Sequence, residues 1–451
     1  MSEKPRTEPA RGMRDFLPED IRRREHVIGV IKRVYERYGF EPLETPAVEN
    51  IETLLGKYGE EGNQLIFKIL MRGEHEATGK ADLALRYDLT VPLARVLAHH
   101  QAKLPRLFKR YQIQPVWRAD RPARGRFREF YQCDVDTCGS ASPVVEAELC
   151  AAVSDVLTEL GFNDFVIRIN HRELLSALLL AADIAPEHQA QVLVTLDKLD
   201  KVGPGGVTKE LTERGVGVES QDRLLAWLDA AAKLRLRPND ELDALEFCAS
   251  YGNGRAALDN LKAIVQLTAA GSAAGKISVD PSLARGLSYY TGAIMEINVP
   301  DLAGSLGGGG RYDNLVGMFL GQSIPACGFS LGLERILVVM GERNMFPPSL
   351  ATTPADVMVS AFDASGMAAA MTLAGQLRAA GLRVLVYPDP DKIGRQIKYA
   401  DGRGIPFVAL LGENEIKDGT VTVKNLAEQT QTTYGQSEAG PKILEDLKHR
   451  G

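Results

Sequence analysis

The chain has 451 residues, of which 45% are hydrophobic and 25% are charged, and its formal net charge is −6. This composition is typical of a globular protein, and the length suggests about three domains. The longest apolar run falls short of the ~20 residues that a membrane span needs, and the N-terminus has no apolar signal-peptide core, so we expect a cytoplasmic location. The five cysteines include no C-x-x-C pair and the seven histidines no zinc-binding spacing, which predicts reduced thiols and no metal site built from side chains.

The first predicted helix covers residues 18–38. Acidic residues fall in its first turn, and Gly39, which is free to adopt a positive φ, ends it. Apolar residues of the helix recur on one face: Ile21, Ile28, Ile31, Tyr35 and Tyr38. Residues 39–48, GFEPLETPAV, then form an extended segment, whose two prolines suit an edge or interface strand and not a central one.

Residues 103–128 are strongly basic, with nine Lys or Arg and one acid, Asp120. A basic run is usually a solvated surface, but aromatic residues are interleaved here, which favours attraction of a polyanion. Alternating apolar and charged residues predict two antiparallel strands joined by a loop at Asp120–Gly125. In such a pair Arg118 and Phe130 can share a surface, and a guanidinium beside an aromatic ring suits a nucleotide.

A helix is predicted over residues 144–161, and residues 162–278 then change character, being rich in Ala, Leu, Lys and Asp. Helical periodicity recurs there in three stretches, 171–183, 187–202 and 220–235. The sequence GPGG at 203–206 interrupts this periodicity. We interpret 162–278 as a helical insertion, and a solvated helical spacer is the alternative.

Strand and glycine patterns return at 284–332. The GGGG at 307–310 is either a flexible turn or a backbone that must approach a ligand closely. The common nucleotide-binding loops, G-x-G-x-x-G after a strand and G-x-x-x-x-G-K-[ST], are absent from the sequence. Residues 328–337, GFSLGLERIL, predict a strand that runs into a helix with Arg335 in its first turn. This arginine is either a satisfied surface residue or one that reaches across a sheet toward a nucleotide.

The sequence FPPSLATTP at 346–354 has the composition of a linker. Beyond it the pattern is β-α-β-α-β, with strands at VMVSAF, LRVLVYP and FVALLG and helices around 367–380 and 392–403. This alternation predicts a small, largely parallel sheet with its own core.

Taken in order, these segments resemble the class II aminoacyl-tRNA synthetases. GFEPLETPAVEN is similar to motif 1, the dimer-interface motif, the arginine-bearing strands to motif 2, and GLER to motif 3. Three further segments, LRYDLT (85–90), ARGLSYYTG (284–292) and GGGGRYDNLV (307–316), look like histidyl-tRNA synthetase in particular, and RGMRDFLP (11–18) also fits. The resemblance covers nearly the whole chain.

The resemblance implies an α+β fold, in which an antiparallel sheet flanked by helices carries a helical insertion and is followed by an α/β anticodon-binding domain. The implied parts are residues 1–161 (catalytic, motifs 1 and 2), 162–278 (helical insertion), 279–345 (catalytic, histidine-specific motifs and motif 3), 346–354 (linker) and 355–451 (anticodon-binding domain).

The implied reaction is ATP-dependent ligation of L-histidine to tRNA(His) through a histidyl-adenylate, in a homodimer with no membrane attachment. Neither step needs a protein nucleophile, so catalysis depends on positioning and positive charge, and Mg²⁺ is expected to enter bound to ATP. By resemblance, Arg118 and Arg285 are catalytic and reach the α-phosphate. The implied ATP-binding residues are Arg118, Asp120, Phe130, which stacks on adenine, and Arg335.

The resemblance also implies a set of histidine-binding residues: Asp88, Leu89, Thr90, Gln132, Asp136, Tyr289 and Tyr290. The carboxylate of Asp88 corresponds to the position that meets the α-ammonium group. Asp136 and Tyr290 correspond to positions that read the imidazole, because a buried polar group left unmet rejects a wrong substrate. Two positions depart from the family: Ser288 replaces a usual acidic residue and Asp120 a usual Glu. Ser288 leaves open which carboxylate orients Arg285 or Tyr290.

Three other functions are consistent with parts of this pattern. A regulatory subunit of histidine biosynthesis resembles the catalytic domain without charging tRNA, but it typically lacks the anticodon-binding domain and several of the arginines kept here. Another class II synthetase, for proline, threonine or glycine, is disfavoured by ARGLSYYTG. An RNA-binding or sensor module with an inactive synthetase domain is expected to bring an additional domain, for which no span remains.

The sequence generates one prediction about Arg285. Its fixed charge would stabilise the transition state without reorganisation, so Arg285→Ala is expected to raise the activation free energy of adenylation by about 3–4 kcal/mol. Single-turnover formation of the adenylate measures this. An adenylation rate that barely changes would rule out the assignment.

Overall fold

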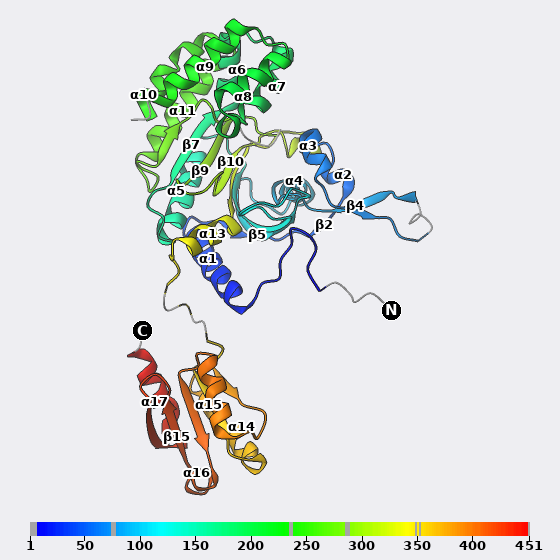
Figure 1. Cartoon of the computed structure of the whole chain (residues 1–451). Helices are drawn as coiled ribbons and strands as arrows, with labels where there is room; N and C mark the ends of the chain where they lie inside the picture. Colours follow the sequence, from blue (N-terminus) through cyan, green and yellow to red (C-terminus); the bar gives the residue numbers. More distant parts are fainter. Residues whose placement is uncertain are drawn as a thin grey trace. The chain divides into compact units, whose positions relative to one another are not determined.

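The computed structural model describes residues 7–73, 78–233, 238–284, 289–347, 350 and 353–449. The chain forms two compact units (Figure 1). The first comprises Met1–Leu17 and Arg23–Met345, and the second comprises Pro18–Arg22 and Phe346–Gly451.

An eight-stranded sheet organises the first unit, in the spatial order β1-β5-β6-β11-β10-β9-β7-β8. The end pairs β1/β5 and β7/β8 are parallel, and the other neighbours are antiparallel. The α+β fold expected from the sequence, with a mainly antiparallel sheet, is therefore confirmed. The strands are β1 (Glu41–Pro42), β5 (Phe108–Trp117), β6 (Glu129–Cys138), β7 (Val166–His171), β8 (Ile277–Val279), β9 (Ala293–Asn298), β10 (Gly307–Arg311) and β11 (Ala326–Gly332).

Strands β5 and β6 are the antiparallel pair that the alternating pattern predicts, in register from Phe108 opposite Cys138 to Trp117 opposite Glu129. Successive side chains of a strand point to opposite faces of the sheet. On β6, Cys133 and Val135 are buried apolar residues of one face, while the intervening polar residues belong to the other. This alternation gives the sheet one apolar face and one polar face at β6.

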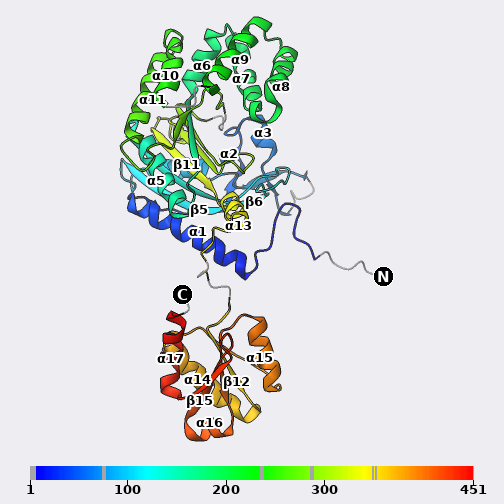
Figure 2. The ribbon, with the colours of Figure 1, turned by 60° about the vertical axis from the view of Figure 1, so that its left-hand side comes forward.

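Helix α1 (Pro18–Arg37) covers the apolar face beside β5, as Figure 2 shows. The Tyr35 ring lies 6.2 Å from the Tyr111 ring, and Tyr111 donates a hydrogen bond to Glu36 at 2.8 Å. The predicted helix is confirmed, but its predicted face is partly wrong. The buried residues are Val27, Val30, Ile31, Val34 and Tyr35, whereas Ile28 and Tyr38 are only partly buried.

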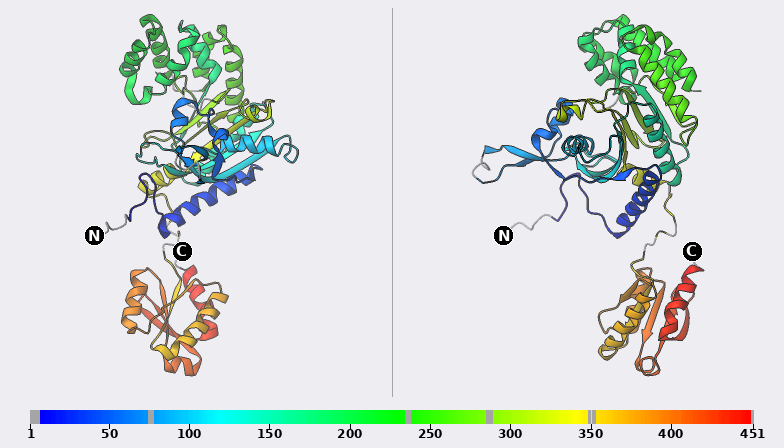
Figure 3. Two further views of the ribbon diagram at one scale, coloured as in Figure 1. Left: turned by 90° about the vertical axis from the view of Figure 1, so that its right-hand side faces the viewer. Right: turned by 180° about the vertical axis from the view of Figure 1, so that it is seen from behind.

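The extended segment after α1 forms the short strands β1 and β2 (Val48–Asn50). Strand β2 belongs to a three-stranded sheet with β4 (Ala81–Leu85) and β3 (Lys68–Leu70), in the order β2-β4-β3. This small sheet projects from the body of the first unit (Figure 3). Three helices lie near it along the chain: α2 (Ile51–Leu54), α3 (Gly59–Gln64) and α4 (Thr90–His99).

Helices gather at the β7–β9 end of the sheet (Figures 1 and 2). They are α6 (Arg172–Ala181), α7 (Pro186–Leu196), α8 (Leu199–Glu213), α9 (Val218–Lys233), α10 (Pro238–Ala244) and α11 (Gly254–Thr268), with a 3₁₀ turn at Glu246–Ser250. The GPGG sequence lies inside α8, where Gly203 has φ 69° and kinks the helix. Strand β7 and the first two residues of β8 also fall within residues 162–278, and both strands belong to the large sheet.

Two helices pack near the centre of the large sheet, α5 (Val144–Glu159) and α13 (Leu333–Glu342), while the short helix α12 (Gly317–Leu320) packs against α4. Helix α5 confirms the helix predicted at 144–161. It is apolar on most of its circumference, and ten of its residues are buried. A helix that is apolar all round lies within a core, as α5 does between the sheet and α11.

The four glycines at 307–310 lie in strand β10, between β9 and β11. A Cβ on Gly309 would lie 2.1 Å from the carbonyl oxygen of Gly328, and one on Gly307 would lie 2.4 Å from that of Ser330. The interpretation as a flexible turn is therefore wrong. Glycine is required because the backbone of the neighbouring strand approaches too closely for a side chain.

The second unit contains a five-stranded sheet in the order β13-β12-β14-β15-β16. The predicted β-α-β-α-β pattern is confirmed, and its three strands are parallel. Two further antiparallel strands were not predicted, so the sheet is mixed. The elements are β12 (Val357–Ala361), α14 (Met367–Ala379), β13 (Val384–Val386), α15 (Ile393–Gly402), β14 (Phe407–Leu411), α16 (Glu413–Asp418), β15 (Thr420–Asn425), β16 (Thr430–Gly435) and α17 (Gln436–Lys448).

Helices cover both faces of this sheet (Figure 2). Val357 and Val359 of β12 join a core with residues of α14 and α17, whereas Met358 joins a second core with Ala400 of α15. Parallel strands are ordinarily buried on both faces in this way. In the described part of the chain, no helix is both long and apolar enough to cross a membrane.

The crowding at Gly309 generates a stability prediction. Gly309→Ala is expected to lower the free energy of unfolding by about 2–3 kcal/mol, because the new methyl group must displace strand backbone. Chemical denaturation followed by tryptophan fluorescence measures this, and both tryptophans, Trp117 and Trp227, lie in the first unit.

The matched control is Gly29→Ala, since Gly29 lies inside α1 and a Cβ there meets nothing nearer than the end of Arg33, at 3.7 Å. Alanine is favoured over glycine in a helix by about 0.5–1 kcal/mol, so this variant is expected to be at least as stable as the parent. A Gly309→Ala protein as stable as Gly29→Ala would contradict the interpretation of the close approach.

Candidate functional site

A cavity of about 510 Å³ lies on the polar face of the large sheet. Four neighbouring strands contribute to its wall, with Phe130 and Gln132 from β6, Met295 from β9, Gly308 from β10 and Ser330 from β11. Loops and helix ends complete the wall: they include Asp88, Thr90, Arg118, Gly125, Arg126, Phe127, Asp197, Leu283, Tyr289, Tyr290, Ser305, Glu334 and Arg335. Pockets that hold small molecules typically have volumes of about 300–1,000 Å³.

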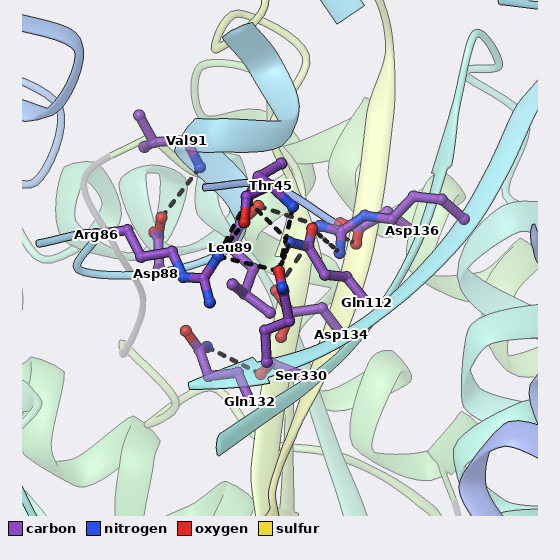
Figure 4. Close-up of polar contacts among 12 residues, drawn as sticks. Thr45, Arg86, Asp88, Leu89, Val91, Gln112, Gln132, Asp134, Asp136 and Ser330 are labelled. Carbon is purple, nitrogen blue, oxygen red and sulfur yellow. Dashed lines mark hydrogen bonds and ion pairs between the residues drawn. The ribbon is translucent and has the colours of Figure 1, made fainter. Parts of the chain in front are cut away.

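A ladder of buried polar side chains runs along β5 and β6 on this face (Figure 4). In register, Arg110, Gln112 and Gln114 of β5 lie opposite Asp136, Asp134 and Gln132 of β6. Hydrogen bonds continue along β5, from Arg110 to Gln112 at 3.1 Å and from Gln112 to Gln114 at 2.7 Å. The ladder therefore leads from the sheet interior to the cavity wall at Gln132.

The inner end of the ladder is a buried ion pair. Arg110 is fully buried, and its Nη2 lies 2.8 Å from Oδ2 of Asp136 and 3.8 Å from Oδ2 of Asp134. The other oxygen of Asp136 accepts a hydrogen bond from the Tyr312 hydroxyl. A Cβ on Gly328, which pairs with Asp136 across the sheet, would lie 1.8 Å from this carboxylate. Gly328 therefore provides the space for the charge.

The ladder also contacts the segment similar to motif 1. Gln112 donates to Oγ1 of Thr45 at 2.9 Å, and Arg86 donates to the carbonyl oxygens of Thr45, at 2.6 Å, and Pro46, at 3.2 Å. Arg86 is 1% exposed and also donates to Oε1 of Gln114 at 3.0 Å. Buried polar groups are costly unless they are bonded, so these contacts hold the segment against β5.

Asp88 lies at the start of α4, with its carboxylate on the cavity wall although the residue is 1% exposed. Three donors meet it: the hydroxyls of Tyr58 at 3.0 Å and Tyr289 at 3.1 Å, and the backbone N–H of Val91 at 3.0 Å. Burial raises the pKa of Asp88, although these donors act in the opposite direction. An anion held this way would gain from a cationic group brought into the cavity.

Two further carboxyl groups beside the cavity have strongly raised pKa values. Burial raises the pKa of Asp134 to about 7 against the opposing effect of Arg110, and burial raises that of Glu334 to about 7. Glu334 lines the cavity, while Oδ1 of Asp134 has no hydrogen-bond partner among the described residues. Perturbed pKa values in a cavity are typical of functional sites.

Arg118 and Phe130 share the cavity wall, as the paired strands predict. The Arg118 guanidinium lies 5.2 Å from the centre of the Phe130 ring and 4.3 Å from that of Tyr87. Its Nε donates to the Tyr87 carbonyl oxygen at 3.0 Å, which fixes the group without using either Nη. The arrangement offers a fixed cation and a flat apolar surface side by side.

Arg335 lines the cavity from the first turn of α13 and donates to the Ser305 carbonyl oxygen. A Cβ on Gly125 would lie 3.2 Å from the Arg335 side chain, so the loop between β5 and β6 passes directly over this arginine. Arg335 therefore lies on the cavity wall, and its contact with a nucleotide stays a prediction.

The predicted site residues therefore fall into three groups. Those that line the cavity are Asp88, Thr90, Arg118, Phe130, Gln132, Tyr289, Tyr290 and Arg335. Leu89, Asp120 and Asp136 are not among the described residues of the wall. Asp120 makes a bidentate ion pair with Arg126, at 2.8 and 3.0 Å, and the Leu89 carbonyl oxygen accepts from Arg110 at 3.3 Å. Arg285 and Ser288 lie outside the described residues.

The sequence did not single out Tyr58, Arg110, Asp134 and Tyr312, which hold the site together. A period-two signal was available for two of them, because Arg110 and Asp134 alternate with apolar residues on predicted strands. Tyr312 lies within GGGGRYDNLV, a segment that the resemblance picked out, but neither it nor Tyr58 could be assigned a role, since only the fold brings their hydroxyls to Asp136 and Asp88. No group of three or more His, Cys, Asp or Glu placed to hold a metal ion occurs in the described part of the chain.

The sequence and fold are similar to those of known proteins. A family model described as "Histidyl-tRNA synthetase" matches residues 12–336, and one described as "Anticodon binding domain" matches residues 356–446. The histidine–tRNA ligase of Cytophaga hutchinsonii is 41% identical over 448 residues, covering 94% of this chain and 97% of that protein. The histidine–tRNA ligase of Gloeobacter violaceus is 40% identical, covering 97% of this chain and 98% of that protein.

Solved structures give a consistent result. The histidyl-tRNA synthetase of Nostoc sp. PCC 7120 superposes with a TM-score of 0.80 at 30% identity, covering 98% of this chain and 100% of that one. A Bacillus halodurans C structure, described as an ATP phosphoribosyltransferase regulatory subunit/histidyl-tRNA synthetase, has a TM-score of 0.72 at 21% identity, covering 91% of this chain and 98% of that one. At that identity the likeness concerns the fold alone.

The buried ion pair generates a prediction about substrate affinity. Asp136→Asn keeps the size of the side chain but leaves Arg110 without its nearest anion. Asp136 corresponds to a position that reads the imidazole ring of histidine, and a hydrogen bond to a charged group contributes about 1.5–3 kcal/mol. We therefore expect the KM for histidine to rise roughly tenfold or more, while the KM for ATP changes little. Adenylation kinetics with each substrate varied in turn measure both values.

Asp134→Asn is the control, since the Asp134 carboxylate lies 3.8 Å from Nη2 of Arg110 whereas that of Asp136 lies 2.8 Å away. Its effect on the KM for histidine is expected to be smaller. If Asp136→Asn raised the KM for histidine and the KM for ATP equally, the change would indicate a general loss of structure. That result would contradict the assignment of Asp136 to histidine recognition.

Proposed function

Because the chain belongs to the histidyl-tRNA synthetase family, we propose that it is a histidine–tRNA ligase that couples ATP to the attachment of L-histidine to tRNA(His). The observation that carries the proposal within this structure is the cavity of about 510 Å³ beneath the β5–β6 loop. Its wall combines a cation–aromatic pair, Arg118 and Phe130, with a buried carboxylate, Asp88. A nucleotide and an amino acid would therefore meet in one space.

The proposed first step forms a histidyl-adenylate. The histidine carboxylate attacks the α-phosphorus of ATP, a new P–O bond forms, and the bond to pyrophosphate breaks. Arg118 would stabilise the negative charge that develops on the α-phosphate, with Arg285 as a second cation. Such fixed charge needs no reorganisation during the reaction. Phe130 would stack on adenine, with Arg335 against the other side of the nucleotide.

Histidine would be held at the other end of the cavity. Asp88 would accept the α-ammonium group, with Thr90 and Gln132 beside it, and the two charges would offset the cost of burying either one. Tyr290, backed by the carboxylate of Asp136, would read the imidazole ring. In the second step the terminal ribose hydroxyl of the tRNA attacks the adenylate carbonyl carbon, and AMP leaves.

Magnesium would enter with ATP, and the residues present fit such an ion. Mg²⁺ prefers oxygen ligands and is commonly held by substrate phosphates together with one or two carboxylates. Glu334 supplies a carboxylate on the cavity wall. The ion would neutralise charge on the β- and γ-phosphates.

The remaining expectations concern partners and location. We propose that the C-terminal α/β domain, 355–451, contacts the anticodon, and that the helical part of 162–278 contacts the acceptor arm of the tRNA; a solvated spacer is the alternative for the latter. The homodimer would form through the segment similar to motif 1, which Arg86 holds against β5. A cytoplasmic location stays a prediction.

Amino-acid-dependent ATP–pyrophosphate exchange tests the proposal. Histidine alone among the 20 amino acids is expected to support exchange, and purified tRNA(His) is then expected to accept the activated histidine. Exchange with proline, threonine or glycine would assign the chain to another class II specificity. A protein that supports no exchange would match the regulatory subunit of histidine biosynthesis and overturn the proposal.

A further inference from the structure

An N-terminal arm, defined here as residues 11–16, packs against the loop that joins β5 to β6. The backbone N–H of Arg128 donates to the Gly12 carbonyl oxygen at 2.8 Å. Gly12 has φ +84°, and a Cβ there would lie 2.9 Å from side-chain carbons of both Arg128 and Pro122. The arm therefore approaches the loop as closely as a glycine allows.

Arg14 extends this contact to the cavity. Its guanidinium carbon lies 3.4 Å from the centre of the Phe127 ring, within the range of a cation–π interaction, and 4.8 Å from that of Phe16. Phe127 lines the cavity next to Arg126. Arg14 therefore contacts the Phe127 ring, and Phe127 also lines the cavity in which the nucleotide is proposed to bind.

Arg14 also reaches the opposite wall. Its Nη2 lies 4.0 Å from Oε1 of Glu334, and the other oxygen of Glu334 accepts the backbone N–H of Tyr131 at 3.0 Å. Glu334 lines the cavity beside Arg335, in the first turn of α13. One arginine therefore connects the β5–β6 loop, through Phe127, with the helix that carries Arg335.

A second cation–aromatic contact holds the arm in place. The Arg24 guanidinium lies 4.1 Å from the centre of the Phe16 ring and 4.8 Å from that of Tyr131. Phe16 thereby lies between two arginines, one on the arm and one on α1. The Arg24 contacts with Phe16 and Tyr131 involve neither Arg14 nor Phe127, so the Arg14–Phe127 pair can be altered while the arm stays attached.

We propose that Arg14 is a positioning residue for ATP: by holding Phe127 and Glu334 it keeps both walls of the nucleotide end of the cavity in place before ATP binds. A wall that is already ordered loses less conformational freedom on binding, which favours affinity. Arg14 need not touch ATP for this effect. The inference rests on the proposed function, because it takes ATP as the occupant of this end of the cavity.

The test is equilibrium binding by calorimetry, with ATP alone and with histidine alone, to the full-length chain. Arg14→Ala is expected to raise the Kd for ATP about threefold to tenfold, the factor that corresponds to a cation–π contact, and to leave the Kd for histidine unchanged. Arg11→Ala is the matched control on the same arm. The Arg11 side chain is exposed and makes none of the contacts described above.

Two further variants separate positioning from a general loss of structure. Arg14→Lys keeps a cation over the ring and is expected to bind ATP within about twofold of the parent. Phe127→Leu is expected to raise the Kd for ATP, and adding Arg14→Ala to it is expected to raise the Kd less than in the parent, because the contact with the Phe127 ring is already lost and only that with Glu334 remains. Gly12→Val, which displaces the arm without touching Arg14, is expected to shift the ATP Kd in the same direction.

The outcomes are distinct. An Arg14→Ala protein with the parent Kd for ATP, or with equal losses for ATP and histidine, overturns the inference. If the parent binds ATP but supports no exchange with histidine, the proposed function fails while the ATP Kd of Arg14→Ala still decides the role of Arg14. If the parent binds no ATP, both proposals fail.

Discussion

The buried charge of Arg110 is the constraint on which the centre of the molecule depends. A guanidinium with no solvent exposure is tolerable only where anions and hydrogen-bond acceptors surround it. Asp136, Asp134, Gln112 and the Leu89 carbonyl oxygen meet it from a neighbouring strand, its own strand and the start of α4. Satisfying one cation therefore fixes the register of β5 and β6 and the approach of the loop that carries Asp88.

Glycines in the central strands of the sheet provide the space that the buried polar side chains and the closely spaced strands need. Gly328 gives the Asp136 carboxylate its space, while Gly307 and Gly309 allow β10 and β11 to lie in close contact. Bulk is excluded from the central strands so that polar side chains from β6 can occupy the face that holds the cavity. The large sheet therefore carries buried polar side chains on one face and an apolar core on the other, and hydrogen bonds and ion pairs within the polar network favour one arrangement of the strands.

The strands β5 and β6 and the helices α1, α5 and α14 could be predicted from the sequence because their signals are local and periodic. The same holds for the pairing of Arg118 with Phe130, which requires only two antiparallel strands. The antiparallel strands β15 and β16 were missed. Strand β16 (TQTTYG) has almost no apolar signal, and its first four residues are exposed, whereas β15 (TVTVKN) alternates Thr with buried Val and could have been predicted. Site residues that lie within recognisable sequence motifs could be predicted. The hydrogen bonds from Tyr58 to Asp88 and from Tyr312 to Asp136 could not, because only the tertiary structure brings these residues together.

The order of the strands has a consequence for biosynthesis. Strand β6 is paired on one side by β5, which precedes it closely in the chain, and on the other side by β11, which is synthesised only after all the helices α6–α11. Until Ala326–Gly332 emerges, β6 has an open edge, and its polar face lacks Gly328 and Ser330. Open edges invite wrong pairing. The helices α6–α11 are therefore synthesised before strands β9, β10 and β11, which form part of the cavity wall. The cavity can be completed only when nearly the whole first unit has been synthesised.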